Sequence, residues 1–421
     1  MWLANMRKQL RLLLLMSVSL GACSVLAQEP SKPDAATSNL DKLRAEGYEA
    51  LYNLDYDGAR RRFEEMARLF PDHPAGAQSY AASLWLQHLN QSWRLKASLY
   101  TNESYTSGKE KADPKLVADF RQWARRAKTL SEARLRLNSS DTEALYFLGA
   151  TEGLESAFAA AVERRYLGAL RSGSRAVDRH RAVLKLAPDY HDAELTIGLY
   201  NYIVGSLPLS LKIMAGTIGY RGSKKRGLET LERVAKEGRW ARDLARVLLM
   251  DLYKREKRWA DAAALATDLS GRYPKNYIFK LQIADAVSNE LANQRQKKSA
   301  GPSAADYDRV FEIFENLLRD KKLAEAGNGA AEIVHFRYGE ALAAAGQNER
   351  AAREFLTVAR RSSEAGLVTM ARLRAGQTLD LLGKRPEALV EYRAVLNGPD
   401  IYNLHQEARR GLREPYKSTV K

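Results

Sequence analysis

A spacing pattern that recurs along the chain constrains its fold more than any other feature. Three stretches place an alanine twelve residues after a glycine and an aromatic residue four residues after the alanine: Gly47, Ala59 and Phe63; Gly339, Ala351 and Phe355; and Gly376, Ala388 and Tyr392. The last two are offset by 37 residues. Two more stretches repeat the step from Ala59 to Pro71, namely Ala176 to Pro188 and Ala262 to Pro274. Such a period indicates stacked copies of one supersecondary unit.

The residue types in this pattern suit a pair of antiparallel helices. Small residues let two helix backbones cross closely, and an aromatic ring one turn beyond the alanine fills the space beside the crossing. Proline ends the second helix because it lacks an N–H and disfavours helix at the preceding residue. The pattern resembles the tetratricopeptide repeat. We therefore predict an all-α fold, a tetratricopeptide-type α-solenoid of antiparallel helix pairs over residues 40–421, with a terminal capping helix from Tyr402 to Glu414.

The first residues are typical of an export signal. Three basic residues precede an apolar run from Leu12 to Ala27, which is 16 residues long and ends in a small-residue cleavage site. Residues 1–27 are therefore predicted to be a signal peptide, followed by a polar linker at 28–39. Leu20 to Cys23 also resembles the lipobox of bacterial lipoproteins, which would end the signal at residue 22 and attach lipid to Cys23. Both alternatives predict an exported protein of the bacterial envelope, periplasmic or associated with the outer membrane.

The balance of charge is strongly basic. The formal net charge is +16 at pH 7. A basic excess suits an acidic lipid surface as a partner, although arginine-rich helix faces in solvent explain it equally well. Nucleic acid is not an expected partner of an exported chain. Cys23 is the only cysteine, so no internal disulfide is expected to stabilise the fold.

One segment interrupts the repeat pattern. Residues 206–223 are apolar and rich in glycine where a short turn is expected, so we predict an inserted segment there. The 14 residues of 207–220 are too few to span a bilayer, which takes about 20. Either the segment packs against its own solenoid, or it forms a lid or membrane contact through Leu207, Leu211, Met214 and Ile218. Polar stretches at 101–112 and 293–305 are predicted to be loops.

The same segment carries a second resemblance. Asn201, the run Ser206-Leu207-Pro208, the pair Gly219-Tyr220 and the pair Gly227-Leu228 resemble part of the tetratricopeptide repeat protein 39 family, which includes the yeast inclusion-body clearance protein. The match covers about residues 198–231. It implies an all-helical, non-enzymatic scaffold from a family linked to membrane-bounded or lipid-droplet-associated roles in eukaryotic cells. This chain departs from the family in carrying an export signal, so the family's location is not transferred to it.

The sequence contains no motif typical of catalysis or metal binding. Its six histidines form no His-Glu-x-x-His motif, and no two of them lie four residues apart. Neither a Gly-x-Ser-x-Gly motif nor a phosphate-binding glycine loop occurs. Asp189 to Asp192 places a histidine among carboxylates at a predicted helix start, where capping explains the aspartates better than catalysis does. We predict no enzymatic activity, no metal and no cofactor.

Tetratricopeptide arrays generally bind partners on the face built by the first helix of each pair. The positions that form a Lys/Asn clamp in chaperone-binding members here hold Arg44, Tyr48, Leu195, Leu199, Phe336 and Glu340, so that clamp is absent. The candidate groove residues are Tyr146, Asn201, Tyr202, Arg337 and Arg374, with burial in the core as the alternative for the tyrosines and ordinary solvent exposure as the alternative for the arginines. We predict a non-catalytic scaffold that binds a protein or peptide partner. The alternative is a carrier of a lipid or acyl ligand, or a membrane-associated protein, that uses residues 207–220.

Overall fold

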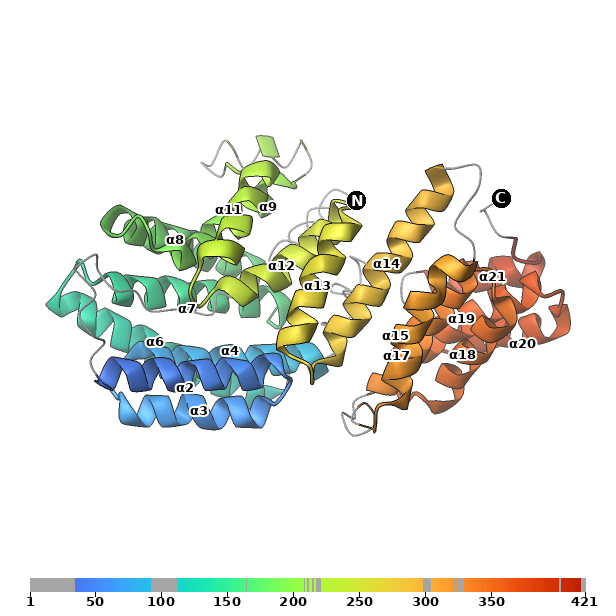
Figure 1. Ribbon diagram of the computed structural model, residues 1–421, viewed down its shortest axis with the longest axis horizontal. Helices are drawn as coiled ribbons and strands as arrows, with labels where there is room; N and C mark the ends of the chain where they lie inside the picture. The colour runs from blue at the N-terminus through green and yellow to red at the C-terminus, as the bar shows by residue number, and fades with distance from the viewer. Residues whose placement is uncertain are drawn as a thin grey trace. The chain divides into compact units, whose positions relative to one another are not determined.

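The computed structural model describes residues 35–91, 113–163, 165–207, 209, 212–213, 216, 221–297, 304–321, 323, 329–400 and 403–417 (Figure 1). Within these residues the regular secondary structure consists of helices, without a β-strand. The chain divides into two compact units. Unit 1 comprises the described residues up to Leu252 together with Arg272–Asn276, and unit 2 comprises Tyr253–Gly271 and the described residues from Tyr277 onward. The repeat spacing runs through both units and does not reveal this division.

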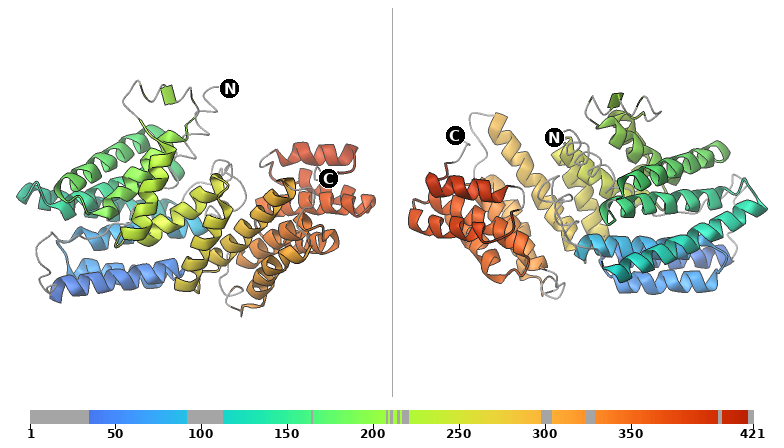
Figure 2. Two further views of the ribbon diagram at one scale, coloured as in Figure 1. Left: turned by 45° about the horizontal axis from the view of Figure 1, so that its top comes forward. Right: turned by 180° about the vertical axis from the view of Figure 1, so that it is seen from behind.

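The helices of unit 1 form successive pairs. In chain order they are α2 (Ala35–Tyr52), α3 (Tyr56–Leu69), α4 (Pro74–Gln91), α6 (Pro114–Leu137), α7 (Thr142–Ala161), α8 (Tyr166–Leu186), the short 3-10 helix η1 (His191–Ala193), α9 (Glu194–Gly205), α11 (Lys224–Glu237) and most of α12 (Arg242–Arg255). Within the pairs, α2 packs on α3, α4 on α6, α7 on α8 and α9 on α11. Figures 1 and 2 show α2, α3, α4, α6 and α7 lying side by side.

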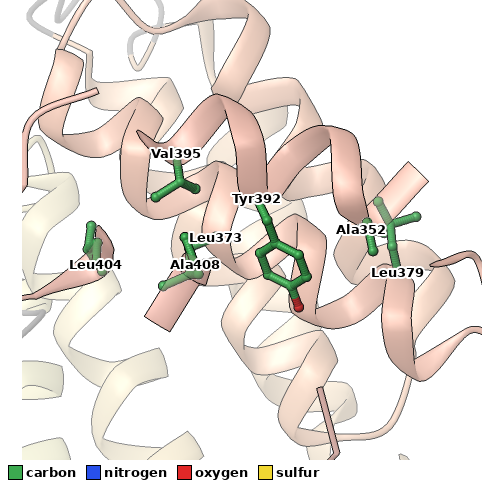
Figure 3. Packing of buried hydrophobic residues seen from close by; sticks show 8 residues of the cluster. Ala352, Leu373, Leu379, Tyr392, Val395, Leu404 and Ala408 are labelled. Atoms are coloured by element: carbon green, nitrogen blue, oxygen red, sulfur yellow. The ribbon is translucent and has the colours of Figure 1, made fainter. Parts of the chain in front are cut away.

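Unit 2 continues the same arrangement. Its helices are the end of α12, most of α13 (Trp259–Arg272), α14 (Tyr277–Lys297), the 3-10 helix η2 (Ala304–Tyr307), α15 (Asp308–Arg319), α17 (Ala330–Ala344), α18 (Asn348–Arg361), α19 (Ala365–Leu381), α20 (Arg385–Leu396) and α21 (Leu404–Arg413). The final helix α21 packs on α20 and α19, where Leu404 and Ala408 join Tyr392 and Val395 in one apolar cluster (Figure 3). A helix therefore covers the last pair, as the capping segment predicted.

The spacing of glycine and aromatic residues corresponds to direct contacts between paired helices. A Cβ atom added to the glycine would lie 2.3 Å from the ring in the pair Gly47 and Phe63, 2.7 Å in Gly339 and Phe355, and 2.8 Å in Gly376 and Tyr392. Because real Cβ atoms do not approach so closely, only glycine fits at these crossings. The intervening alanines are fully buried at Ala59, Ala351 and Ala388. The predicted fold class, an all-α tetratricopeptide-type array of antiparallel helix pairs, is confirmed.

Three predicted boundaries differ from the structure. α2 begins at Ala35, so residues 35–39 of the predicted linker are helical. α14 continues to Lys297 and η2 begins at Ala304, so residues 293–297 and 304–305 of the second predicted loop are helical as well. Strong helix formers and a hydrogen bond from Gln294 to Glu290 (3.1 Å) maintain this polar end of the helix. The predicted loop at 101–112, the predicted signal at 1–27 and Cys23 lie outside the described residues.

Glycines allow the backbone to pack closely at the two ends of the interval between α9 and α11. The first helix ends at Gly205 and the second begins at Lys224, so the interval is 206–223. A Cβ atom on Gly205 would lie 2.3 Å from the backbone nitrogen of Lys224, and one on Gly222 would lie 2.7 Å from the carbonyl oxygen of Asn201. Backbone therefore touches backbone where the interval leaves and re-enters the helix pair, as in a loop with closely spaced ends.

Replacing Gly227 by alanine is expected to lower the free energy of unfolding of unit 1 by about 3 kcal/mol. A Cβ atom there would lie 2.4 Å from the backbone nitrogen of Tyr202, and a backbone atom cannot rotate away as a side chain can. Gly168→Ala in the same unit is the control, because its nearest neighbour is Arg165 Cβ at 4.0 Å. That change should raise stability by about 0.5–1 kcal/mol through helix propensity. Urea unfolding of both variants measures the contrast, and equal effects would contradict it.

Candidate functional site

The described residues contain no arrangement typical of a metal centre, since no group of three or more His, Cys, Asp or Glu is placed to hold an ion. Most described histidines contact carboxylates instead. His73 lies 3.1 Å from Glu143, and His335 lies 2.6 Å from Glu354. In the same part of the chain, no helix is long and apolar enough to cross a membrane.

The cluster at 189–192 requires a correction, because it does not cap the helix that it precedes. The N-cap residues of η1 and α9, Tyr190 and Ala193, make no side-chain capping hydrogen bond. Asp192 instead accepts hydrogen bonds from the backbone N–H groups of Trp240 (3.0 Å) and Ala241 (2.8 Å), just before α12. A buried carboxylate that accepts two backbone hydrogen bonds is a structural group, and it ties two turns of unit 1 together.

The first-helix face of unit 1 is filled where α2 meets later elements. Arg44 on α2 is fully buried, with its guanidinium carbon 4.7 Å from the ring of Trp240, 5.3 Å from Phe147 and 5.8 Å from Tyr48. The opposite charge of Asp192 acts on the same guanidinium. Unit 1 therefore has a cationic core at this point rather than an open groove.

Contacts over long sequence separations hold α2 in this place. Arg239 pairs with Asp41 on α2 at 2.6 Å. Near the C-terminal end of α2, Asn276 donates a hydrogen bond to the carbonyl oxygen of Tyr52 at 2.7 Å, and the rings of Tyr52 and Tyr273 lie 5.0 Å apart. The beginning and the end of unit 1 thus pack against each other.

Three of the predicted groove residues belong to the interior or the scaffold of unit 1. Tyr146 is 1% exposed and stacks between His180 (5.1 Å) and Tyr190 (5.0 Å). Tyr202 is also buried. Asn201 is half-buried and donates to the carbonyl oxygen of Ile197 in its own helix at 3.1 Å. The assignment of the two tyrosines to an accessible groove was therefore wrong, since the packing of α7 against α8 and of α9 against α11 encloses their rings.

The other two predicted groove residues, Arg337 and Arg374, lie together in unit 2 in a continuous line of polar side chains. We call this line the charged row. Its members are Lys254 on α12, Gln282 and Asp285 on α14, Arg337 and Glu340 on α17, Arg374 and Gln377 on α19, and Glu407 on α21. The row connects the first helices of successive pairs. It alternates in charge, with a basic residue at Lys254, Arg337 and Arg374 and an acidic residue at Asp285, Glu340 and Glu407.

The inner half of the row is buried and internally paired. Lys254 lies 3.8 Å from Asp285 and donates a hydrogen bond to Gln282. Arg337 pairs with Asp285 across the gap between α17 and α14. Because these charges are removed from water, their mutual pairing is required for the fold to tolerate them. This half of the row fixes the position of the exposed half.

In the outer half of the row, Arg374 and Glu407 are exposed, Glu340 is partly exposed and Gln377 is buried between them in sequence order. The side chain of Glu340 receives a hydrogen bond from Arg337 at 2.5 Å and lies 3.8 Å from Arg374. Arg374, with a side chain 47% exposed, donates to Gln377 at 3.0 Å, and Gln377 donates to Glu407 at 3.3 Å. These side chains present hydrogen-bond donors and acceptors in a fixed order along three helices. Such an array can recognise polar groups spaced along an extended chain.

The predicted lid residues are only partly within the described structure. Leu207 is buried, which contradicts its assignment to an exposed lid and fits the alternative in which the segment packs on its own helices. Leu211, Met214 and Ile218 lie outside the described residues. Among the described residues of the interval, the exposed large apolar side chains are Leu209 and Ile213. The sequence pattern did not single them out because Leu211, Met214 and Ile218 formed the clearer helical stripe.

The chain was compared with known proteins at three levels. No protein-family model and no curated protein matches it. Among solved structures, the IFIT1 monomeric mutant with Gppp-AAAA is 12% identical with a TM-score of 0.42, over 97% of this chain and 86% of that one. A tetratricopeptide repeat protein from Parabacteroides merdae is 12% identical with a TM-score of 0.28, over 79% and 99%. The APC/C hetero-tetramer Cut9-Hcn1 is 13% identical with a TM-score of 0.18, over 89% and 84%.

At these scores the similarities carry no inference about ligands or partners of this chain. The assignment of a tetratricopeptide-type fold rests on the contacts between paired helices described above.

Proposed function

We propose that the protein is a non-catalytic scaffold of the bacterial cell envelope and binds a protein partner along the charged row. The observation that carries the proposal is the fixed alternation of charge across α14, α17, α19 and α21, with Arg374 exposed and Glu340 partly exposed. The buried ion pair between Arg337 and Asp285 holds α17 and α14 in place beneath this surface. The side chains of the charged row already pair with one another, so a partner must replace these pairs with its own. Such a surface favours specific binding over high affinity.

The geometry favours an extended segment as the part of the partner that binds. Packed helices lie about 8–10 Å apart, and an extended chain advances about 3.3 Å per residue. First helices that pack directly on each other, α14 on α17 and α19 on α21, therefore face side chains about three residues apart. The expected ligand is an extended segment with acidic and basic residues alternating at that spacing.

The alternation of charge also distinguishes the row from a nucleic-acid surface. A phosphate backbone requires a groove of one sign, because each contact neutralises a negative charge. The row instead alternates Arg337, Glu340, Arg374 and Glu407. This supports a protein partner.

Site-specific photocrosslinking in native cells tests the proposed partner surface. A photoreactive amino acid replaces Arg374 in one variant and Arg353 in the control, because Arg353 is an exposed arginine on the second helix α18 of the same unit. We expect the same crosslinked protein from Arg374 and Glu340 positions and none from Arg353. Arg374→Glu should abolish capture of that protein from a crosslinker at position 340. Equal crosslinking from position 353, or no crosslinking from positions 340 and 374, would count against the proposal.

The envelope location is tested separately by the mass of the mature chain. Cleavage of the predicted signal gives a chain that begins at Gln28, and lipoprotein processing gives one that begins at an acylated Cys23. A chain that retains Met1 and fractionates with the cytoplasm would refute export and leave the partner surface untouched.

A further inference from the structure

The interval between α9 and α11 presents two large apolar side chains to solvent. Leu209 is 75% exposed and Ile213 is 63% exposed. They lie four residues apart in sequence, and each of the two residues is helical. Leu207 is buried beside them, and the glycine contacts at Gly205 and Gly222 hold the base of the interval closed. The two ends of the segment that contains the apolar pair are therefore held in contact with each other.

The surroundings of this pair are exclusively cationic in sequence. From Leu195 to Leu228 the chain contains no acidic residue and five basic ones, which are Lys212, Arg221, Lys224, Lys225 and Arg226. Lys212, Arg221, Lys225 and Arg226 are exposed. α11 begins at Lys224, directly after the interval, so the cations at its start follow the apolar pair closely along the chain.

We infer that Leu209 and Ile213, together with the exposed cations Lys212, Arg221, Lys225 and Arg226, form a peripheral contact with an anionic lipid surface. Leu209 and Ile213 enter the interface between head groups and acyl chains, and the cations pair with lipid phosphates. A membrane needs only a few apolar side chains flanked by cations. A stable protein interface buries about 800 Å² on each partner, far more than two side chains offer. The site lies in unit 1 and stands independently of the charged row.

A fluorophore attached at single sites tests the contact in the full chain. Cys23 is the only cysteine, so Cys23→Ser gives a cysteine-free background in which Ile213→Cys carries an environment-sensitive dye. With vesicles that contain phosphatidylglycerol, we expect a blue shift of the dye, and the shift should fall with added salt. Leu137→Cys is the control, because Leu137 is 90% exposed elsewhere in unit 1. Its dye should keep its aqueous emission with the same vesicles.

Charge variants test the second half of the inference. Lys225→Gln together with Arg226→Gln should weaken vesicle binding, read from the dye at position 213, about tenfold or more. Arg125→Gln with Arg136→Gln, two exposed arginines on α6, should leave it unchanged. An aqueous emission at position 213 with anionic vesicles, or an equal shift at position 137, would overturn the inference. Equal binding to vesicles of phosphatidylcholine alone would overturn the role of the lipid charge. A shift that only an acidic protein produces would also overturn it and identify a protein contact.

Discussion

Replacing Asp192 by asparagine is expected to lower the free energy of unfolding of unit 1 by about 3–5 kcal/mol. Asparagine keeps an oxygen that can accept the hydrogen bonds from the backbone of Trp240 and Ala241, so the change removes mainly the negative charge. Arg44, buried among aromatic rings, then loses the carboxylate that acts on it. Burial raises the pKa of Asp192, and the hydrogen bond from the backbone of Ala241 and the charge of Arg44 oppose this rise. Urea unfolding followed by circular dichroism measures the loss.

The double variant Arg44→Met with Asp192→Asn separates the charge from the packing. Methionine fills the space between the rings without a positive charge. Asparagine carries no negative charge, so no buried charge is left without its opposite. We expect this variant to return to within about 1 kcal/mol of the natural chain, because replacing a buried ion pair by neutral groups is often nearly neutral. If the two single changes simply added, the coupling between Arg44 and Asp192 would be refuted.

Lowering the pH from 6.5 to 4 is expected to cost unit 1 about 3 kcal/mol through His180. Burial lowers the pKa of His180 from 6.5 to about 4, while a hydrogen bond with the backbone oxygen of Tyr146 partly opposes the shift. In this window the unfolded chain binds the proton and the folded chain does not. The contribution is therefore fully present above pH 6.5, and it is lost as the pH falls toward 4. Urea unfolding across this range measures the slope.

His180→Phe is the matched control for this pH dependence. The ring of His180 lies against Gly149, where an added Cβ atom would be 2.6 Å from its Cδ2. Phe63, Phe355 and Tyr392 occupy the corresponding position against a first-helix glycine in other pairs. Phenylalanine should therefore fit, and it cannot take up a proton. The difference in stability between the natural chain and this variant should change by about 3 kcal/mol between pH 6.5 and 4. A difference that stays constant would show that His180 does not titrate in this way.

Much of the local structure could be predicted because its determinants lie close together in sequence. Gly339 meets Phe355 only 16 residues later, so the residue types and their spacing define the helix pair. The candidate site was less accessible to prediction. Arg337 and Arg374 were selected singly, and their connection through Glu340 depends on how α17 lies beside α19. In the interval, helical periodicity could not identify Leu209 and Ile213 as the exposed residues, because it does not say which side of a turn faces the protein.

The sequence by itself determined that this chain forms antiparallel helix pairs of the tetratricopeptide type, since each crossing needs a glycine or alanine and a ring at a fixed distance along the chain. Only the tertiary structure decided which first-helix faces remain open. Arg44 is buried because the start of unit 1 packs against residues about 200 positions later, as its contact with Trp240 and the pair of Asp41 and Arg239 show. Small rotations between successive pairs add up to that closure, and no local spacing records their sum.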